Sequence, residues 1–258
     1  MGSLSLLEKR PSAEVLIAAR ETTTHEGPAI ETPARPPALS SAQPKKSRSR
    51  WSPFPSVGFT SFPMQPRATI PKLADLDVVL TTPRLRLRPL RDDDVDDLWP
   101  YVSDPQFPRM MSWAAPTDKE QTRAFIQALH DGFAANTDCV WAIEHLGKVW
   151  GTIGLDSITW EVRAWRIDRA EMGYWLAPPM WNQGLMTEAA LVVMRFAFET
   201  LGLHKVSIGC FAENAASRRV IEKCGFRYVG RYEEDVWRDG AWHSHLRFEM
   251  LASEWSQL

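Results

Sequence analysis

From about residue 76 onward, the spacing of apolar and polar positions predicts regular secondary structure. RLRLRPL (84–90) alternates apolar and polar side chains, as a half-buried strand does. Residues 92–102 then place their apolar side chains on one helical face, behind three aspartates that suit a helix N-terminus. Thr117 and Glu120 fit a capping box at the start of a second helix. The domain is therefore expected to open with one strand and two helices.

The rest of the chain predicts a sheet and two more helices. Strands flank Gly147-Lys148, a hairpin signal, and a second hairpin turns at Asp239-Gly240. Asn214 is expected to cap the last helix and Gly225 to end it. Between these lie a strand at 170–177, a long helix at 184–201 and a strand at 205–211. The order strand, two helices, three strands, helix, strand, helix and hairpin predicts one α+β domain with a mixed sheet.

Residues 1–75 differ in composition from the predicted domain at 76–258. They hold eleven of the nineteen prolines and one of the twelve tryptophans, so they cannot bury enough apolar surface to offset the entropy of ordering. We expect a largely disordered, Pro-rich extension. KKSRSR (45–50) is either a nuclear or anionic-surface signal or, as we prefer, a solvated basic linker. The aromatic segment 51–63 is either a strap on the domain or more linker.

Composition and charge narrow the functional class. The chain has 258 residues and a net charge of −2, and its three cysteines lack the spacing of a disulfide framework or a zinc site. We see no membrane span and no secretory signal. Residues 76–258 carry twenty Lys/Arg and twenty-six Asp/Glu, and this acidic balance disfavours nucleic acid as the main ligand. We expect a cytoplasmic enzyme or binding protein, monomeric or homodimeric, without a metal.

Residues 181–190, WNQGLMTEAA, form a turn between a predicted strand and a predicted helix. The N–H groups at a helix N-terminus and the helix dipole suit a phosphate or pyrophosphate. Gly184 would let such a ligand approach the backbone. A single glycine at a helix start is, however, more often structural than ligand-binding.

The segment EMGYWLAPPMWNQGLMTEAA (171–190), followed by NAASRRVIEKCGF (214–226), resembles the GNAT superfamily of acetyl-coenzyme A (acetyl-CoA)-dependent N-acetyltransferases. The resemblance covers about residues 80–255 and is greatest to the branch that acetylates the N-termini of ribosomal proteins. It implies a GNAT-like three-layer α/β/α fold, with coenzyme A in a V-shaped gap of a central mixed, splayed β-sheet. The implied acceptor is a primary amine, on a protein N-terminus or a small molecule.

The same resemblance implies which residues hold acetyl-CoA. The backbone of one strand would pair with the pantetheine arm, the 181–186 turn would hold the pyrophosphate, and an N-x-x-S motif would lie near the sulfur. These residues are Met172, Gly173, Tyr174, Trp175, Leu176, Asn182, Gln183, Gly184, Leu185, Met186, Thr187, Asn214 and Ser217. The chain departs from the family pattern at Met186, where bulk would displace the phosphates, and at Ile221, where many relatives have a tyrosine acid.

The implied reaction is direct attack of the amine on the thioester, without a covalent enzyme intermediate. Glu171 is the expected base, and an ordinary strand-end carboxylate is the alternative. Ser217 is expected to protonate or hydrogen-bond the leaving thiolate, and Gly173 to form a bulge that splays the sheet. The closing hairpin carries further candidates for the amine side of the cleft, or plain surface residues: Glu233, Glu234, His243 and His245. A non-catalytic acyl-CoA-binding module is the competing hypothesis.

Overall fold

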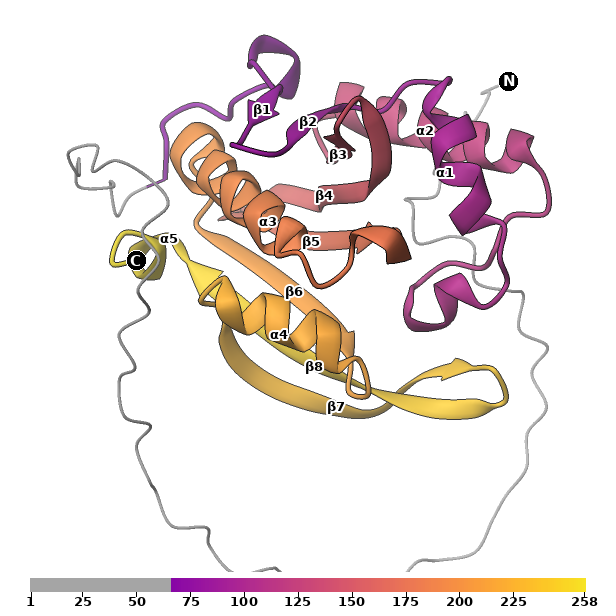
Figure 1. The fold of residues 1–258 in the computed structure, drawn as a ribbon. Helices are drawn as coiled ribbons and strands as arrows, with labels where there is room; N and C mark the ends of the chain where they lie inside the picture. Colours follow the sequence, from indigo (N-terminus) through magenta and orange to yellow (C-terminus); the bar gives the residue numbers. More distant parts are fainter. Residues whose placement is uncertain (1–65) are drawn as a thin grey trace, which may run out of the picture. The chain divides into compact units, whose positions relative to one another are not determined.

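The computed structural model describes residues 66–258, so the predictions for 45–50 and 51–63 lie outside the described part. Residues 66–258 form an eight-stranded sheet in the order β1-β2-β3-β4-β5-β6-β8-β7 (Figure 1). Its neighbouring strands are antiparallel except β5 and β6, which are parallel. The predicted α+β class with a mixed sheet is confirmed.

The predicted order of elements is also confirmed. The strands are β1 (Leu80–Thr81), β2 (Arg86–Pro89), β3 (Cys139–His145), β4 (Lys148–Val162), β5 (Trp165–Leu176), β6 (Lys205–Phe211), β7 (Arg227–Arg238) and β8 (Ala241–Leu251). The helices are α1 (Asp94–Val102), α2 (Lys119–Ala134), α3 (Leu185–Arg195), α4 (Ala215–Lys223) and α5 (Ala252–Trp255), and a π-helical turn (Phe196–Leu201) continues α3.

Helices cover both faces of the sheet, which gives three layers. Figure 1 shows α3 and α4 in front of the sheet, and their apolar residues share a core with Trp141 and Met172. Apolar residues of α1 and α2 form a second core with Ala142 and Trp175. Because successive side chains of a strand point to opposite faces, these neighbours on β3 and β5 place the two cores on opposite sides of the sheet.

Local signals at helix ends explain most of the element boundaries. Asn214 caps α4 by accepting a hydrogen bond from the Ser217 N–H (3.0 Å), and Gly225 follows α4 with a φ of +84°, as predicted. The cap of α2 is not Thr117 but Asp118, whose carboxylate accepts the Gln121 N–H at 2.9 Å. Asp118 is the better acceptor because it is charged and the helix dipole favours an anion there.

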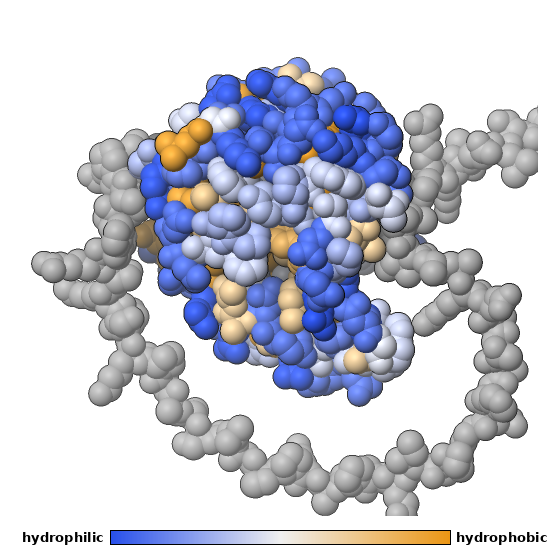
Figure 2. Space-filling view, turned by 45° about the vertical axis from the view of Figure 1, so that its right-hand side comes forward, coloured by the Kyte–Doolittle hydropathy of each residue, from blue (hydrophilic) through white to orange (hydrophobic). Residues whose placement is uncertain are grey.

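The packed domain starts a few residues before the expected boundary at residue 76. Leu73 is fully buried in the core shared with α3, and its N–H donates to the Asn136 side chain at 2.8 Å. Figure 2 shows a mostly polar surface on one face, with apolar residues in small, separate areas. Within the described part of the chain, no helix has both the length and the apolar character needed to cross a membrane.

The sheet opens between its two parallel strands. Glu171 pairs with Ser207, and the pairing of β5 with β6 stops there, although β5 continues to Leu176 and β6 to Phe211. Figure 1 shows the two strands diverging beyond this point. On its other side, β5 stays paired with β4 as far as Leu176. The predicted splay is therefore present, and one edge of β5 is left without a strand partner.

A β-bulge next to this opening lies in β4, not at Gly173 as expected. Gly173 pairs in register with Gly154, whereas the register of β4 shifts between Asp156 and Thr159. Ser157, inside the shift, has a φ of +51°. A bulge bends its strand and increases the local twist. The irregularity in β4 therefore coincides with the level at which β5 and β6 part.

Candidate active site

The exposed edge of β5 offers backbone groups to the opening. The Ala177 N–H donates to the Trp150 carbonyl on the β4 side (2.7 Å), whereas the Ala170 carbonyl accepts the Ser207 hydroxyl on the β6 side (3.3 Å). Backbone groups of successive residues point to alternate sides of a strand. Met172 and Tyr174 therefore direct their N–H and carbonyl groups into the opening.

The other three β5 residues expected to bind the cofactor differ in the direction or the partners of their backbone groups. The same alternation directs the backbone groups of Gly173 and Trp175 toward β4. Leu176 faces the opening, but its carbonyl accepts the Trp181 indole N–H at 2.5 Å. Met172, Tyr174 and the Leu176 N–H are thus the strand groups that a ligand in the opening can reach.

The turn before α3 has the backbone form that suits an anion. Asn182 and Gly184 have φ values of +60° and +76°, which explains a glycine at the second position without any ligand. The first intrahelical bond runs from the Glu188 N–H to the Gly184 carbonyl (3.1 Å). The N–H groups of the three residues before Glu188, namely Leu185, Met186 and Thr187, have no partner within the helix.

The bulk of Met186 does not obstruct this turn. The Met186 side chain is 7% exposed and packs in the core, as does that of Leu185. Asn182 and Gln183 are exposed, and the Gln183 side chain donates to the Pro179 carbonyl at 2.9 Å. The displaced phosphate expected from Met186 therefore has no basis in the packing, because only its backbone faces the turn.

Arg84 brings a positive charge to the turn, a contact that no sequence pattern indicates. Its guanidinium donates to the Gln183 carbonyl (2.9 Å) and forms an ion pair with Glu188 (2.5 Å). Partial burial of Glu188 opposes its ionisation, but hydrogen bonds from Thr82 and Arg84 prevail and lower the pKa of this carboxyl. The pair crosses 104 residues of sequence, so only the fold brings it together.

The N-x-x-S residues lie at the start of α4, facing β5. The Asn214 side chain serves as the helix cap, and the Ser217 hydroxyl lies 3.0 Å from the Tyr174 hydroxyl, which also donates to the Ser217 carbonyl (3.2 Å). Burial raises the pKa of the Tyr174 phenol, which therefore stays protonated at neutral pH. Ile221, which replaces the family's tyrosine, is buried in the core.

Glu171 is partly exposed, and its side chain lies on the face of the sheet opposite to α4 and the Tyr174 side chain. Its carboxylate forms an ion pair with Arg247 of β8 (2.5 Å), and the Arg247 guanidinium also lies over the Tyr232 ring at 5.5 Å from the centroid. Glu171 therefore lies where the pairing of β5 with β6 ends, and a cation engages its carboxylate.

The hairpin residues divide between this site and the surface. His245 packs edge-on against Phe211 (4.5 Å between ring centres), and its Nδ1 lies 3.3 Å from Asp235. Burial lowers the pKa of His245. His243 approaches Glu213 only at 4.0 Å. The Glu233 carboxylate accepts from Ser244 and Arg231, and Glu234 is exposed.

Asp156 of β4 is the carboxylate that the sequence did not single out. It pairs directly with Glu171, so the two side chains share one face of the sheet. Burial raises the pKa of the Asp156 carboxyl to about 7, and the charges of Asp138 and Glu171 add to the effect. The site thus holds one carboxylate neutralised by an arginine and one that titrates near neutral pH.

Aromatic side chains wall the same face beyond Gly173. The Trp175 ring packs edge-on against Phe107 (5.4 Å) and Trp113 (6.3 Å), both from the α1–α2 connection. Arg238, near the tip of the β7–β8 hairpin, donates to the Trp113 carbonyl at 2.9 Å and to the Met111 carbonyl. The connection and the hairpin are thereby held against each other.

A family model described as an acetyltransferase (GNAT) domain matches residues 84–227. The chain belongs to the GNAT acetyltransferase family. It is therefore an N-acetyltransferase, and the non-catalytic alternative is not favoured. The matched range runs from Arg84 through the opening between β5 and β6 to the first residue of β7.

Relatives of this GNAT protein include two curated sequences. The uncharacterized N-acetyltransferase YoaA of Bacillus subtilis is 28% identical over 63% of this chain and 90% of its own length. The FsC-acetyl coenzyme A-N(2)-transacetylase of Aspergillus fumigatus is 27% identical over 69% of this chain and 78% of its own. The structure of RimL, a ribosomal L7/L12 alpha-N-protein acetyltransferase in complex with coenzyme A, has a TM-score of 0.62 at 19% identity, over 68% of this chain and 98% of RimL. The RimL likeness shows that the GNAT fold is shared.

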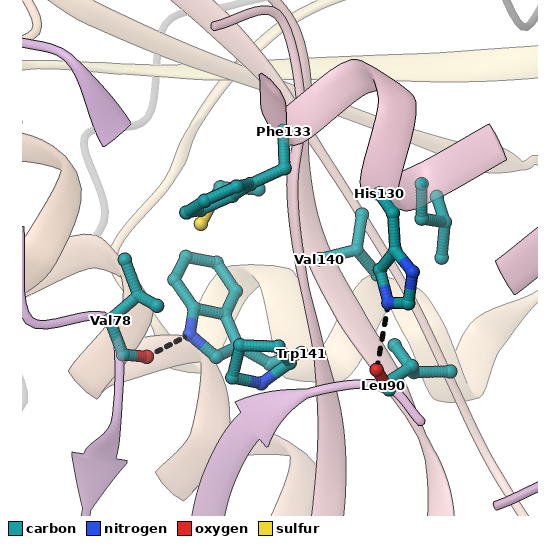
Figure 3. Close-up of a pocket in the computed structure, with 9 residues that line it drawn as sticks. Val78, Leu90, His130, Phe133, Val140 and Trp141 are labelled. Atoms are coloured by element: carbon teal, nitrogen blue, oxygen red, sulfur yellow. Dashed lines mark hydrogen bonds between the residues drawn. The ribbon is translucent and has the colours of Figure 1, made fainter. Parts of the chain in front are cut away.

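A separate apolar cavity of this acetyltransferase lies between α2 and the β2–β3 part of the sheet (Figure 3). It measures about 220 Å³, and its polar groups are already paired: His130 with the Leu90 carbonyl (2.9 Å) and the Trp141 indole with the Val78 carbonyl (2.6 Å). The cavity includes no residue of the opening between β5 and β6.

Proposed function

We propose that this enzyme binds acetyl-CoA in the opening between β5 and β6 and transfers the acetyl group directly to a primary amine. The observation that carries the proposal is the end of β5–β6 pairing at Glu171 and Ser207. Beyond it, the free edge of β5 can pair with an extended ligand, as an added strand would. The pantetheine arm has amide groups for such pairing, and Met172, Tyr174 and Leu176 supply the protein's side.

The diphosphate would lie at the α3 N-terminus. The N–H groups of Leu185, Met186 and Thr187 and the helix dipole suit a double negative charge. Arg84 adds a cation whose charge is shared with Glu188. Asn182, Gln183 and Gly184 would contribute the exposed turn that contacts the phosphates, and Asn214 and Ser217 would line the opposite wall.

The thioester would lie where the strands part, beside the face that carries Glu171. The free amine attacks the thioester carbon, and a backbone N–H of Met172 or Tyr174 stabilises the oxyanion. The Ser217 hydroxyl, hydrogen-bonded to Tyr174, would hold or protonate the departing thiolate. Glu171 would attract and orient the acceptor's ammonium group.

The acceptor is a primary amine, on a protein N-terminus or a small molecule. RimL is named for a ribosomal protein and the Aspergillus relative for FsC, so the names of relatives support neither class alone. Asp156, Glu171 and Asp235 give the open face carboxylates that favour a cation. No nucleic acid or membrane is required as a partner, and a monomer or a homodimer could house the site.

We further propose a cytoplasmic location and a catalytic unit that spans Leu73 to Leu258. Cys139, Cys210 and Cys224 are buried free thiols, which fits a reducing compartment.

Thiol release from acetyl-CoA tests the proposal with purified full-length protein. One acceptor pool holds short peptides with varied N-termini, and the other holds small amines including polyamines and aminoglycosides. Release in one pool would confirm the transferase and choose between the two acceptor classes. Bound acetyl-CoA without release from either pool would contradict the proposed acceptors and support an acyl-CoA-binding module.

A further inference from the structure

We propose that Asp156, and not Glu171, takes the proton from the acceptor amine. The inference rests on the proposed function, because it assigns one step of that reaction. It begins from the direct pairing of the two residues on β4 and β5, at the level where the sheet opens. Both carboxylates point to the face from which the acceptor would arrive.

Two glycines make room for the Asp156 carboxylate. A Cβ at Gly173 would lie 3.1 Å from one carboxylate oxygen, and a Cβ at Gly154 would lie 3.3 Å from the other. Gly154 and Gly173 are paired with each other across the two strands. The carboxylate therefore lies over bare backbone, beside the residues whose N–H groups would hold the thioester oxygen. An amine that attacks the thioester there would pass within reach of Asp156.

The two carboxylates differ in their partners. Glu171 is bound to Arg247 at 2.5 Å. Asp156 has no hydrogen bond or ion pair with any residue between 66 and 258, although it is only partly buried. The Glu171 carboxylate is therefore engaged by a cation, whereas the Asp156 carboxylate has no such partner and is free to accept a proton.

The charged and titratable groups around Asp156 act in the same direction. Asp138 from the turn before β3 and Glu171 from β5 both raise the pKa of its carboxyl, after burial as the main cause. Cys139 of β3 is buried, which raises the pKa of its thiol and leaves it uncharged. The Arg247 guanidinium of β8 is bound to Glu171 and forms no hydrogen bond or ion pair with Asp156 among the described residues. The resulting pKa of about 7 suits a group that accepts a proton at neutral pH.

The β4 bulge fixes the direction of this side chain. Ser157, at the bulge, donates its N–H to Asp138 at 3.0 Å, and the Asp138 carboxylate also accepts the Thr137 hydroxyl at 2.6 Å. These bonds anchor the chain immediately after Asp156. Bulges near active sites commonly serve to orient a side chain.

The proton balance of the proposed step is complete. The ammonium group of the acceptor gives one proton to the Asp156 carboxylate, and the free amine attacks the thioester carbon. A carbon–nitrogen bond forms, the carbon–sulfur bond breaks, and the second amine proton reaches the thiolate. Asp156 then releases its proton to solvent, so each turnover yields amide, coenzyme A thiol and one proton.

The pH dependence of kcat/KM distinguishes the two carboxylates, measured with the acceptor that the thiol-release assay identifies. We expect the wild type to gain activity with rising pH, with a midpoint near 7. Asp156→Asn should lower kcat by about 100-fold or more and remove this rise. Glu171→Gln should keep the rise but move its midpoint to lower pH, because a neighbouring negative charge is lost. The exposed Asp92→Asn variant is the matched control and should follow the wild type.

If Asp156→Asn binds acetyl-CoA with the affinity of the wild type and has the same circular dichroism spectrum, the variant is folded. If the variant does not fold, the midpoint shift of Glu171→Gln still tests the inference. A rise that survives in Asp156→Asn, or disappears in Glu171→Gln, would overturn it while leaving the acetyltransferase intact. No turnover by the wild type would overturn the proposed function as well.

Discussion

The ionisation of Asp156 has a consequence for stability that needs no substrate. Its carboxyl has an ordinary pKa of 3.8 in an exposed chain, and burial together with Asp138 and Glu171 raises this to about 7 in the folded protein. The folded state therefore binds the proton more tightly than the unfolded state does. Stability must then fall as the pH rises from about 4 to about 7, and stay low above that range.

The size of the effect follows from the shift. One pKa unit corresponds to about 1.4 kcal/mol, so the full rise costs about 4 kcal/mol when Asp156 is ionised in the folded state. Because the Asp156 carboxyl titrates at different pH in the folded and unfolded states, its ionisation lowers the free energy of unfolding by about 2.5 kcal/mol between pH 5 and pH 8. Asp156→Asn removes the titrating group and keeps the shape of the side chain. The wild type should therefore lose about 2.5 kcal/mol more than the variant over this interval.

Urea denaturation at pH 5 and pH 8 measures the difference directly. The exposed Asp92→Asn variant serves as the control, because it removes an aspartate without altering the site. It should change with pH as the wild type does. Parallel pH dependence of the wild type and Asp156→Asn would show that the Asp156 carboxyl is not perturbed, and the reasoning from its burial would fail.

Two further substitutions test the turn before α3 and the buried ion pair between Arg88 and Asp94. Gly184→Val should weaken acetyl-CoA binding and lower stability by at least about 1 kcal/mol. The cause is the φ of +76° at Gly184, which a β-branched residue rarely adopts. Crowding is not the cause, since the nearest atom to a new Cβ would be an Arg84 nitrogen at 3.7 Å. Calorimetric titration measures the affinity, with Gly184→Ala as the milder comparison, and unchanged affinity would refute a role of this turn in phosphate binding. Asp94 holds the buried Arg88 guanidinium by two contacts of 2.7 Å. Asp94→Ala should cost about 3–5 kcal/mol in a urea unfolding curve, because it leaves Arg88 buried with Glu144 as its one remaining charged partner among residues 66–258. A loss under about 1 kcal/mol would contradict that view of the pair.

The sequence predicted those features that depend on neighbouring residues. The hairpin turn at Asp239-Gly240 requires two residues with positive φ, and these residue types adopt it readily. The cap at Asn214 likewise depends on a residue three positions away. Asp94 shows the limit, because the sequence placed it at a helix start without showing that it is buried against Arg88. That contact depends on how a strand packs against a helix.

The candidate site contains both features set by neighbouring residues and contacts set by the packing of distant segments. The motif around Gly184 is local and could be recognised, whereas Arg84 reaches the same turn only because the β1–β2 turn packs against the start of α3. Asp156 was missed for a related reason. Its position opposite Glu171 depends on the register of β4, and that register contains a bulge that no pattern of apolar residues indicated.

The same arrangement that makes Asp156 a base also makes it costly. A well-stabilised fold would surround a partly buried carboxylate with donors, yet Asp156 lies against glycine backbone and near two other carboxylates, and no residue between 66 and 258 donates a hydrogen bond to it. Arg247 could have neutralised it but is bound to Glu171. Active sites often retain such unfavourable groups because the reaction requires them, even though replacing them would stabilise the protein. If Asp156→Asn is both more stable at pH 8 and inactive, a single ionisation accounts for both properties.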